Sequence, residues 1–386
     1  MPGRCKGLMI IASKPQVGKT SVSMSIMNIF RKRFGKDNVG FMKPVGQRVV
    51  DAGCGTLIDP DAHLARVYFN IKDEAKHSSP LVIVKGLTKA FVENKIDVTS
   101  EIQRIKSSFE IVSSGKDITI VEGTGHAGVG SILGINNAII AKELGIPVVL
   151  VGTGGLGSTY DELALNKQFY DNYKVPVLGI IVNKVKISKL PMVKHYMTLG
   201  ARQLEVPLLG CIPHTAGFDS PSCSDLEILF GQNMLSKRDA AQKRFKNYEL
   251  VTTSLERFME LLNGKRNVRL EGTCFITHSS RVDLIMGLIT HINSKVTSNN
   301  YESGLILSGI KDATLPKVAE DCIKHCKFPV LASKTTTAET MRLIANYTAK
   351  MDPKDPELVS SLMAQIEPHI YVDAMLKEAQ KRSSEM

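Results

Sequence analysis

Residues 8–20 read LMIIASKPQVGKT, an apolar run that leads into a loop ending in Gly-Lys-Thr. The apolar run has no polar alternation, which is typical of a strand buried on both faces of a parallel sheet. A helical stretch follows at about residues 20–34. The loop at 13–20 therefore lies between a buried strand and a helix start, where backbone N–H groups can bind phosphate. This order of elements predicts a phosphate-binding loop.

The loop matches the pattern G-x-x-x-x-G-K-[ST] except at its first position, where Ser13 replaces glycine. In that pattern the lysine, here Lys19, reaches the β- and γ-phosphates, and the hydroxyl of Thr20 holds Mg²⁺. Serine is tolerable at the first position if its φ is negative. The alternative is a Gly-Lys-Thr helix start without a ligand. The expected nucleotide-binding residues are Ser13, Lys14, Gln16, Val17, Gly18, Lys19, Thr20 and Ser21.

A second buried strand is expected within residues 117–125, DITIVEGTG, and it ends at Glu122. Ligands of parallel α/β sheets gather at the carboxyl ends of the strands, so Glu122 is expected near the phosphate loop. A carboxylate there can bind Mg²⁺ directly or through water. The alternative is a solvated glutamate that ends a strand.

Apolar runs alternate with helical stretches over residues 1–213, and this alternation predicts an α/β domain with a doubly wound parallel sheet. The expected strands are 8–12, 39–42, 118–121, 148–151, 177–182 and 208–212. The expected helices are near 20–34, 100–114, 134–144, 158–172 and 190–204.

The pattern changes at residues 214–224, HTAGFDSPSCS, which have the composition of a linker. A smaller α/β domain is expected at 214–386, and its tail, from Asp355 onward, is expected to add one or two closing helices. The expected strands are near 248–252, 273–277, 304–307 and 329–332. The expected helices are near 225–236, 254–263, 281–293, 315–324 and 337–347.

The 386 residues carry a formal net charge of +11, and only 6% of them are aromatic. Basic residues without interleaved aromatic residues favour a solvated surface, so we expect no nucleic-acid partner. No stretch approaches the ~18 consecutive apolar residues of a membrane helix, and the apolar part of the N-terminus is too short for a signal peptide. The seven scattered cysteines fit a reducing compartment. We therefore expect a cytoplasmic protein without a membrane partner.

Several segments taken together resemble known families. The segments GFMKPV at 40–45, VEG at 121–123 and GIIVNKV at 179–185 resemble the dethiobiotin synthetase-like ATPase fold, which cobyrinic acid diamide synthase shares. Four later segments, in order, resemble the DRTGG domain that follows such a module in the N-terminal half of long phosphate acetyltransferases. They are LGCIP at 209–213, ITHSSRVD at 276–283, GLILSG at 304–309 and FPVL at 328–331.

The resemblance implies roles around the phosphate loop. Lys43 matches a lysine that faces the substrate carboxyl group and the γ-phosphate, so Lys19 and Lys43 are the expected catalytic residues. Glu122 matches a magnesium carboxylate, and Asp61 matches another, with Asp59 as the alternative. The expected metal ligands are therefore Thr20, Asp61 and Glu122.

Four further residues are assigned in the same way. Asn183 matches an asparagine that reads adenine, which implies ATP rather than GTP. Lys14 lies where dimeric ATPases of the K-G-G-x-G-K-T type carry a lysine that reaches the partner's nucleotide, and a surface lysine is the alternative. Arg281 and Asp283 are what remains of the DRTGG signature, because Ser-Gly-Ile at 308–310 replaces its T-G-G. Arg281 contacts an anion on this reading, or merely pairs with Asp283.

The resemblance favours a module that binds Mg²⁺ and ATP, turns ATP over slowly, and regulates its DRTGG-like domain or a partner enzyme such as phosphate acetyltransferase. The acetyltransferase catalytic domain of the long enzymes is not found in these 386 residues, so acetyl transfer is not expected. A homo-oligomer is expected by analogy with this ATPase class. Two alternatives are an ATP-dependent ligase that activates a carboxylate or carbamate, and a nucleotide-binding scaffold without turnover.

Overall fold

A computed structural model describes residues 7–385 except 54, 216, 217, 219, 237–240, 265–271, 296–302, 312–314 and 348–350. Cys5, Cys54 and part of the expected linker at 214–224 lie outside the described residues. The chain forms two compact units, of which the first combines Met1–Thr215 with Met351–Met386 and the second is Ala216–Lys350. No helix in the described ranges is both long and apolar enough to cross a bilayer.

The first unit contains a six-stranded parallel sheet with the strand order β10-β9-β8-β1-β7-β2. All six strands predicted for this domain are present, and continuous runs of Val, Ile and Leu bury them on both faces. Their bounds are β1 (Gly7–Ala12), β2 (Val39–Met42), β7 (Ile118–Glu122), β8 (Val148–Thr153), β9 (Val177–Val185) and β10 (Leu208–Pro213).

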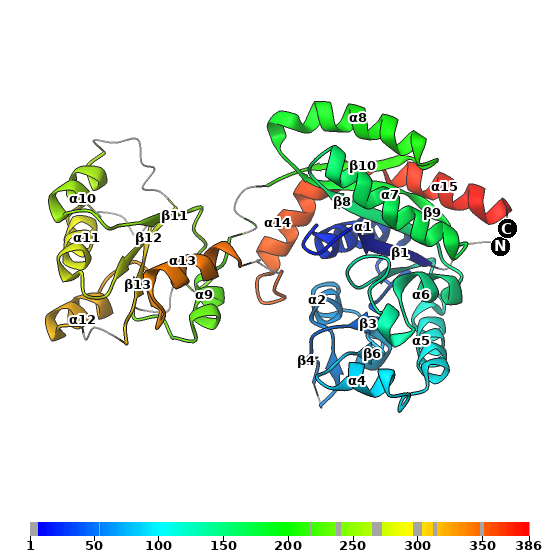
Figure 1. Ribbon diagram of the computed structural model, residues 1–386, viewed down its shortest axis with the longest axis horizontal. Helices are drawn as coiled ribbons and strands as arrows, with labels where there is room; N and C mark the ends of the chain where they lie inside the picture. The colour runs from blue at the N-terminus through cyan, green and yellow to red at the C-terminus, as the bar shows by residue number, and fades with distance from the viewer. Residues whose placement is uncertain are drawn as a thin grey trace. The chain divides into compact units, whose positions relative to one another are not determined.

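Helices cover both faces of this sheet, so the prediction of a doubly wound α/β fold is confirmed (Figure 1). Successive side chains of β1 alternate between the two cores: Met9 and Ile11 enter one, and Leu8 and Ile10 enter the other. The first core is closed by α5 (Val98–Ser113), α6 (Asn137–Leu144), α7 (Gly157–Asn172) and α8 (Leu190–Gln203). The second is closed by α1 (Lys19–Phe34), α2 (Pro60–Phe69), α14 (Pro356–Ile366) and α15 (Val372–Glu385).

The connection between β2 and α5 holds short elements that the sequence pattern did not predict. Four strands of two residues each carry too little periodicity to be recognised. They pair as β3 (Val45–Gly46) with β6 (Leu81–Val82) and β4 (Val50–Asp51) with β5 (Leu57–Ile58). Helices α2, α3 (Ala75–Ser78) and α4 (Leu87–Val92) complete this segment.

The prediction that the tail closes the second domain is wrong. Helices α14 and α15, drawn in orange and red in Figure 1, belong to the first unit. Val359, Met363 and Ile366 of α14 are buried in the same core as α1. Asn28 and Lys32 of α1 also bond to Glu367, at 2.6 Å and 2.5 Å. The apolar spacing of the tail predicts helices correctly, but it does not say which surface they cover.

The second unit is an α/β unit around a four-stranded parallel sheet, in the order β11-β12-β13-β14. Its strands and helices confirm the expected pattern within a few residues at each end. The strands are β11 (Asn247–Leu250), β12 (Thr273–His278), β13 (Gly304–Ser308) and β14 (Val330–Ala332). The helices are α9 (Cys223–Phe230), α10 (Leu255–Leu262), α11 (Val282–Lys295), α12 (Lys317–Lys324) and α13 (Thr337–Ala345).

Candidate nucleotide-binding site

The phosphate loop joins β1 to α1 at the carboxyl edge of the first sheet, as the sequence predicts. Gly18 precedes α1 with φ 83°, and a Cβ atom there would lie 2.5 Å from Asn183 Nδ2. Only glycine fits this position, because it needs both a left-handed backbone and a close approach. Gln16 also has a positive φ, of 64°, whereas Ser13 does not. The serine in place of the first glycine is therefore compatible with the loop.

Helix α7 holds the first half of the loop. Glu162 accepts hydrogen bonds from Lys14 Nζ at 2.8 Å and from Ser13 Oγ at 3.1 Å. One turn later, Asn166 donates to the Ser13 carbonyl at 3.1 Å and accepts from Ala127 N at 2.9 Å. Sequence reasoning missed both α7 residues, because nothing near them in the sequence marks a partner about 150 positions away. Lys14 is thus engaged within its own chain.

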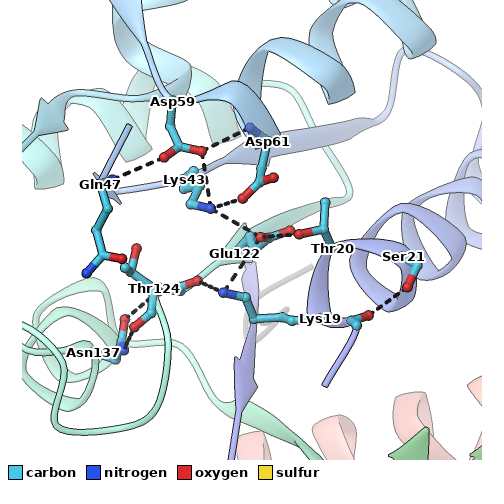
Figure 2. Close-up of polar contacts among 12 residues, drawn as sticks. Lys19, Thr20, Ser21, Lys43, Gln47, Asp59, Asp61, Glu122, Thr124 and Asn137 are labelled. Carbon is cyan, nitrogen blue, oxygen red and sulfur yellow. Dashed lines mark hydrogen bonds and ion pairs between the residues drawn. The ribbon is translucent and has the colours of Figure 1, made fainter. Parts of the chain in front are cut away.

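The second half of the loop faces Glu122, at the end of β7 (Figure 2). Thr20 Oγ1 donates to Glu122 Oε1 at 3.0 Å, and Lys19 Nζ lies 3.7 Å from the same oxygen. Lys19 also donates to the Gly123 carbonyl. Burial lowers the pKa of Lys19, and the neighbouring Lys43 adds to this effect, although Glu122 opposes it. Lys19, Thr20 and Glu122 therefore meet, as predicted.

Lys43 follows β2 and lies among three carboxylates (Figure 2). Its Nζ is 3.2 Å from Asp59 Oδ1 and 3.3 Å from Glu122 Oε1, and it donates to Asp61 Oδ2. Burial alone would lower the pKa of Lys43, but the three carboxylates outweigh that effect and raise it. Lys43 therefore carries its charge in a nearly dry site, where its side chain is only 6% exposed.

The two candidate aspartates have different surroundings. Asp59 is the N-cap of α2, since its carboxylate accepts from Asp61 N at 2.9 Å, and it also accepts from Gln47 N at 3.2 Å. Capping and loop bonds of this kind give Asp59 a structural role. Asp61 lies in the first turn of α2 with its side chain 19% exposed, and that side chain reaches Lys43. The geometry favours Asp61 as the residue that faces a ligand.

The residues present fit a magnesium ion bound together with nucleotide phosphates. Glu122 Oε2 is fully buried and has no hydrogen-bond partner among the described residues, so it has a free acceptor position. Mg²⁺ at nucleotide sites takes one or two protein carboxylates and obtains its other oxygens from phosphate and water. In the described part of the chain no three His, Cys, Asp or Glu side chains form a preassembled metal cluster. Lys43 stands between the acidic groups instead.

The loop after β7 is fixed by Asn137 of α6, another residue that the sequence pattern did not reveal. The side-chain amide of Asn137 accepts a hydrogen bond from the backbone N–H of Thr124 at 3.1 Å and donates one to the Thr124 carbonyl at 2.8 Å. It also donates to the His126 carbonyl at 2.7 Å. Thr124 Oγ1 bonds in turn to the Val45 carbonyl. These contacts, drawn in Figure 2 for Thr124 and Asn137, fix the loop that carries the Gly123 carbonyl, to which Lys19 donates.

Asn183 lies directly behind the phosphate loop. It is 3% exposed, donates to the Val17 carbonyl at 2.8 Å and accepts from Lys184 N at 2.9 Å. The structure thus shows Asn183 supporting the loop, and its adenine contact stays a prediction. Ser21 Oγ donates to the Gly18 carbonyl, three residues earlier, at 2.7 Å. Val17 is buried, and Gln16 is exposed at the tip.

Arg281 and Asp283 lie in the second unit and pair with each other. Arg281 bonds to both oxygens of Asp283, at 2.9 Å and 2.7 Å, and to the Thr253 carbonyl at 3.0 Å. The Asp283 hydrogen bond raises the pKa of Arg281, and the pairing lowers that of Asp283. A helix-start pair therefore accounts for the contacts of both residues, and an anion contact stays a prediction.

Comparisons with known proteins identify the family of the first unit. A family model described as "AAA domain" (AAA_26) matches residues 6–222, more than half of the chain. ATP-dependent dethiobiotin synthetase BioD of Nitrosospira multiformis is 27% identical over 228 residues, which are 58% of this chain and 95% of that protein. The BioD protein of Aromatoleum aromaticum is 28% identical over 204 residues, covering 53% of this chain and 88% of that protein.

A phosphate acetyltransferase of Nitratidesulfovibrio vulgaris is 20% identical over 371 residues. The match covers 94% of this chain, which spans half the length of that relative. Among solved structures, the MinD cell division protein of Aquifex aeolicus aligns with 54% of this chain and 82% of its own, at 15% identity and a TM-score of 0.33. The chain belongs to the AAA domain family (AAA_26), with a P-loop ATP-binding domain of the dethiobiotin synthetase type and a further α/β domain.

Proposed function

We propose that the chain binds ATP with Mg²⁺, hydrolyses it slowly, and uses its nucleotide state to regulate its second unit or a partner enzyme such as phosphate acetyltransferase. The observation that carries the proposal is the meeting of Lys19, Thr20, Lys43, Asp61 and Glu122 at the carboxyl edge of one sheet. These groups come from a phosphate loop, two strand ends and the first turn of a helix. A nucleotide site with a magnesium ion uses a lysine, a hydroxyl and one or two carboxylates of this kind, and Lys43 adds a second positive charge.

Each residue has a distinct part in such a site. Lys19 binds the β- and γ-phosphates; burial disfavours its charged form and lowers its pKa, and an arriving anion offsets that cost. Thr20, Glu122 and Asp61 hold the metal, which neutralises charge on the phosphates. Lys43 contacts the same Glu122 oxygen as Lys19 and Thr20, and from there it can face the transferred phosphoryl group. Asn183 reads adenine in this proposal while it supports the loop.

The regulatory part rests on the relative that matches nearly the whole chain. That protein's name says that it is a phosphate acetyltransferase, and the match extends across both units. A loop segment that is ordered by nucleotide phosphates and released after hydrolysis is a common switch. Here the segment between β2 and α5 carries Lys43, Asp59 and Asp61, and it would respond to the γ-phosphate. An assembly of two copies, with Lys14 near the partner's nucleotide, is part of the same proposal.

A second candidate is an ATP-dependent ligase that activates a carboxylate or carbamate. It is favoured by the BioD relative, of which the match covers 95%, and by Lys43, a charged lysine in a nearly dry site. Two lysines beside a phosphoryl group can neutralise its charge during transfer. A scaffold that binds nucleotide without turnover would have no need of Lys43.

Phosphate release from ATP separates these functions. The wild type is assayed alone, with bicarbonate and a series of diamines and carboxylates, and with a purified phosphate acetyltransferase whose own rate is followed. Slow release that small molecules do not change, together with a nucleotide-dependent change in the acetyltransferase rate, is the expected result. Release that an amine or carboxylate stimulates many-fold supports the ligase. If ATP binds but no phosphate is released in any of these mixtures, the result supports the nucleotide-binding scaffold without turnover.

A further inference from the structure

The ammonium group of Lys43 occupies the space that a metal ion would share with the acidic side chains. It lies 3.2 Å from Asp59, 3.3 Å from Glu122 and in direct contact with Asp61. The side chains of Lys43, Asp59 and Glu122 are 6%, 5% and 0% exposed, so little water screens these charges. The phosphate-loop lysine, Lys19, stands 3.7 Å from the same Glu122 oxygen, Oε1.

We propose that Lys43 is a built-in counter-ion that keeps free divalent cations out of the site, so that the metal enters only together with nucleotide phosphates. The inference rests on the proposed nucleotide-binding function and adds a rule about the order in which the ligands bind. Nucleotide phosphates supply the negative charge that draws the Lys43 ammonium away from the carboxylates. The acidic oxygens then become available to the metal.

Charge and geometry both favour this exclusion. Three carboxylates and two lysines leave about one net negative charge in the site, which is little attraction for a dication that must give up its water. Removal of Lys43 would double that charge. A magnesium ion also binds carboxylate oxygens at about 2.0–2.1 Å. To reach Asp61 Oδ2 or Glu122 Oε1 at that distance it would come close to the Lys43 ammonium, which contacts the same two oxygens and repels another cation.

A ligand position is nevertheless present, which distinguishes this cluster from an ordinary buried ion pair. Glu122 Oε2 is fully buried and has no hydrogen-bond partner in the described part of the chain. A buried carboxylate oxygen without a partner is costly and marks a place where another group binds. Thr20 Oγ1 bonds to the other oxygen of this carboxylate, so a hydroxyl ligand is already beside it. Lys43 blocks one side of an otherwise prepared site.

The test measures the binding of Mn²⁺ alone to the full chain, by calorimetry or from the electron paramagnetic resonance signal of free Mn²⁺. Lys43→Met removes the charge and keeps most of the length of the side chain, and it should bind Mn²⁺ at least tenfold more tightly than the wild type. Lys43→Gln, whose amide can still donate to Asp61, should show the same gain and serves if the methionine variant does not fold. Lys106→Met, at an exposed lysine 3.1 Å from Glu143, is the matched control and should bind like the wild type.

The wild type also tests the idea without any variant. It should bind Mn²⁺ with a non-hydrolysable ATP analogue at least tenfold more tightly than Mn²⁺ alone. Equal affinity of the wild type in both conditions, or no gain in the Lys43 variants, overturns the exclusion by Lys43. Failure of the wild type to bind the analogue with Mn²⁺ overturns the proposed nucleotide function instead, so the two failures are distinguishable.

Discussion

Glu162 of α7 holds Lys14 of the phosphate loop, with 2.8 Å between Glu162 Oε1 and Lys14 Nζ. The other carboxylate oxygen accepts from Ser13 Oγ, so one glutamate fixes two consecutive loop residues. The exposed fractions of the two paired side chains are 42% for Lys14 and 25% for Glu162. This is a partly solvated pair that positions the loop, and within one chain it does not direct Lys14 toward the residues that surround Lys19.

Replacement of Lys14 should therefore have a small effect on nucleotide binding by a single chain. We expect Lys14→Ala to change the affinity for Mg–ATP less than threefold and to lower stability by no more than about 1 kcal/mol, as exposed ion pairs do. Calorimetry at protein concentrations below any self-association measures the affinity. A loss that grows with protein concentration would instead show that Lys14 reaches a partner's nucleotide.

The roles of Asp59 and Asp61 can be distinguished by replacing each of them with asparagine. Asp61→Asn should weaken the Mg²⁺-dependent part of ATP binding about tenfold or more, because it removes a charged oxygen that faces the site. Asp59→Asn should leave that part nearly unchanged, since asparagine is as good an N-cap as aspartate. Titration of each variant with ATP, in the presence and absence of Mg²⁺, gives the Mg²⁺-dependent part of its affinity. If Asp59→Asn weakens that part and Asp61→Asn does not, Asp59 is the metal ligand.

The C-terminal helices should be needed for the stability of the first unit. Met363 of α14 is 1% exposed in the core that contains α1, and truncation of such a side chain costs about 2–5 kcal/mol. We expect Met363→Ala to lower the melting temperature of the transition that Mg–ATP stabilises by about 5 °C or more. Met192→Ala is the matched control, because Met192 is 39% exposed on α8. Equal melting temperatures for the two variants would place α14 outside this core.

Alkaline pH should destabilise the second unit through a buried thiol. Burial raises the pKa of Cys223 to about 12, against an ordinary value of 9.0. Between these values the unfolded chain loses the thiol proton and the folded chain keeps it, so stability falls as the pH rises above about 9. Between pH 8 and pH 10 the free energy of unfolding of the wild type should fall by about 1 kcal/mol more than that of Cys223→Ala. Urea unfolding at both pH values measures this difference, and parallel losses would contradict it.

The elements of the fold could be predicted wherever the pattern is local. Most strands of the two sheets have apolar runs, although β11 reads NYEL, and the phosphate loop has a motif between a strand and a helix. Lys43 and Asp61 were recognised only through the resemblance, because no local pattern joins a lysine after one strand to an aspartate in a later helix. The structure brings these two side chains into direct contact, which the resemblance did not predict.

The remaining features depend on contacts between distant segments. Glu162 and Asn166 approach the loop from a helix about 150 residues later, and an acid or an amide on a helix usually faces water. The wrong prediction for the C-terminal tail has the same cause, because its place also depends on contacts with a distant segment. The apolar face of α14 shows that it packs against something, but the core of either unit would satisfy that requirement.

The most direct test of the account is calorimetric titration of the full chain with ATP in the presence and absence of Mg²⁺. The wild type, Lys19→Ala and the surface control Lys106→Ala are compared. We expect Mg–ATP to bind the wild type and the control alike, and to bind Lys19→Ala at least about 100-fold more weakly, since Lys19 supplies charge-assisted bonds to the phosphates. Equal binding by Lys19→Ala, or no binding by the wild type, would contradict the assignment of this loop as the nucleotide site.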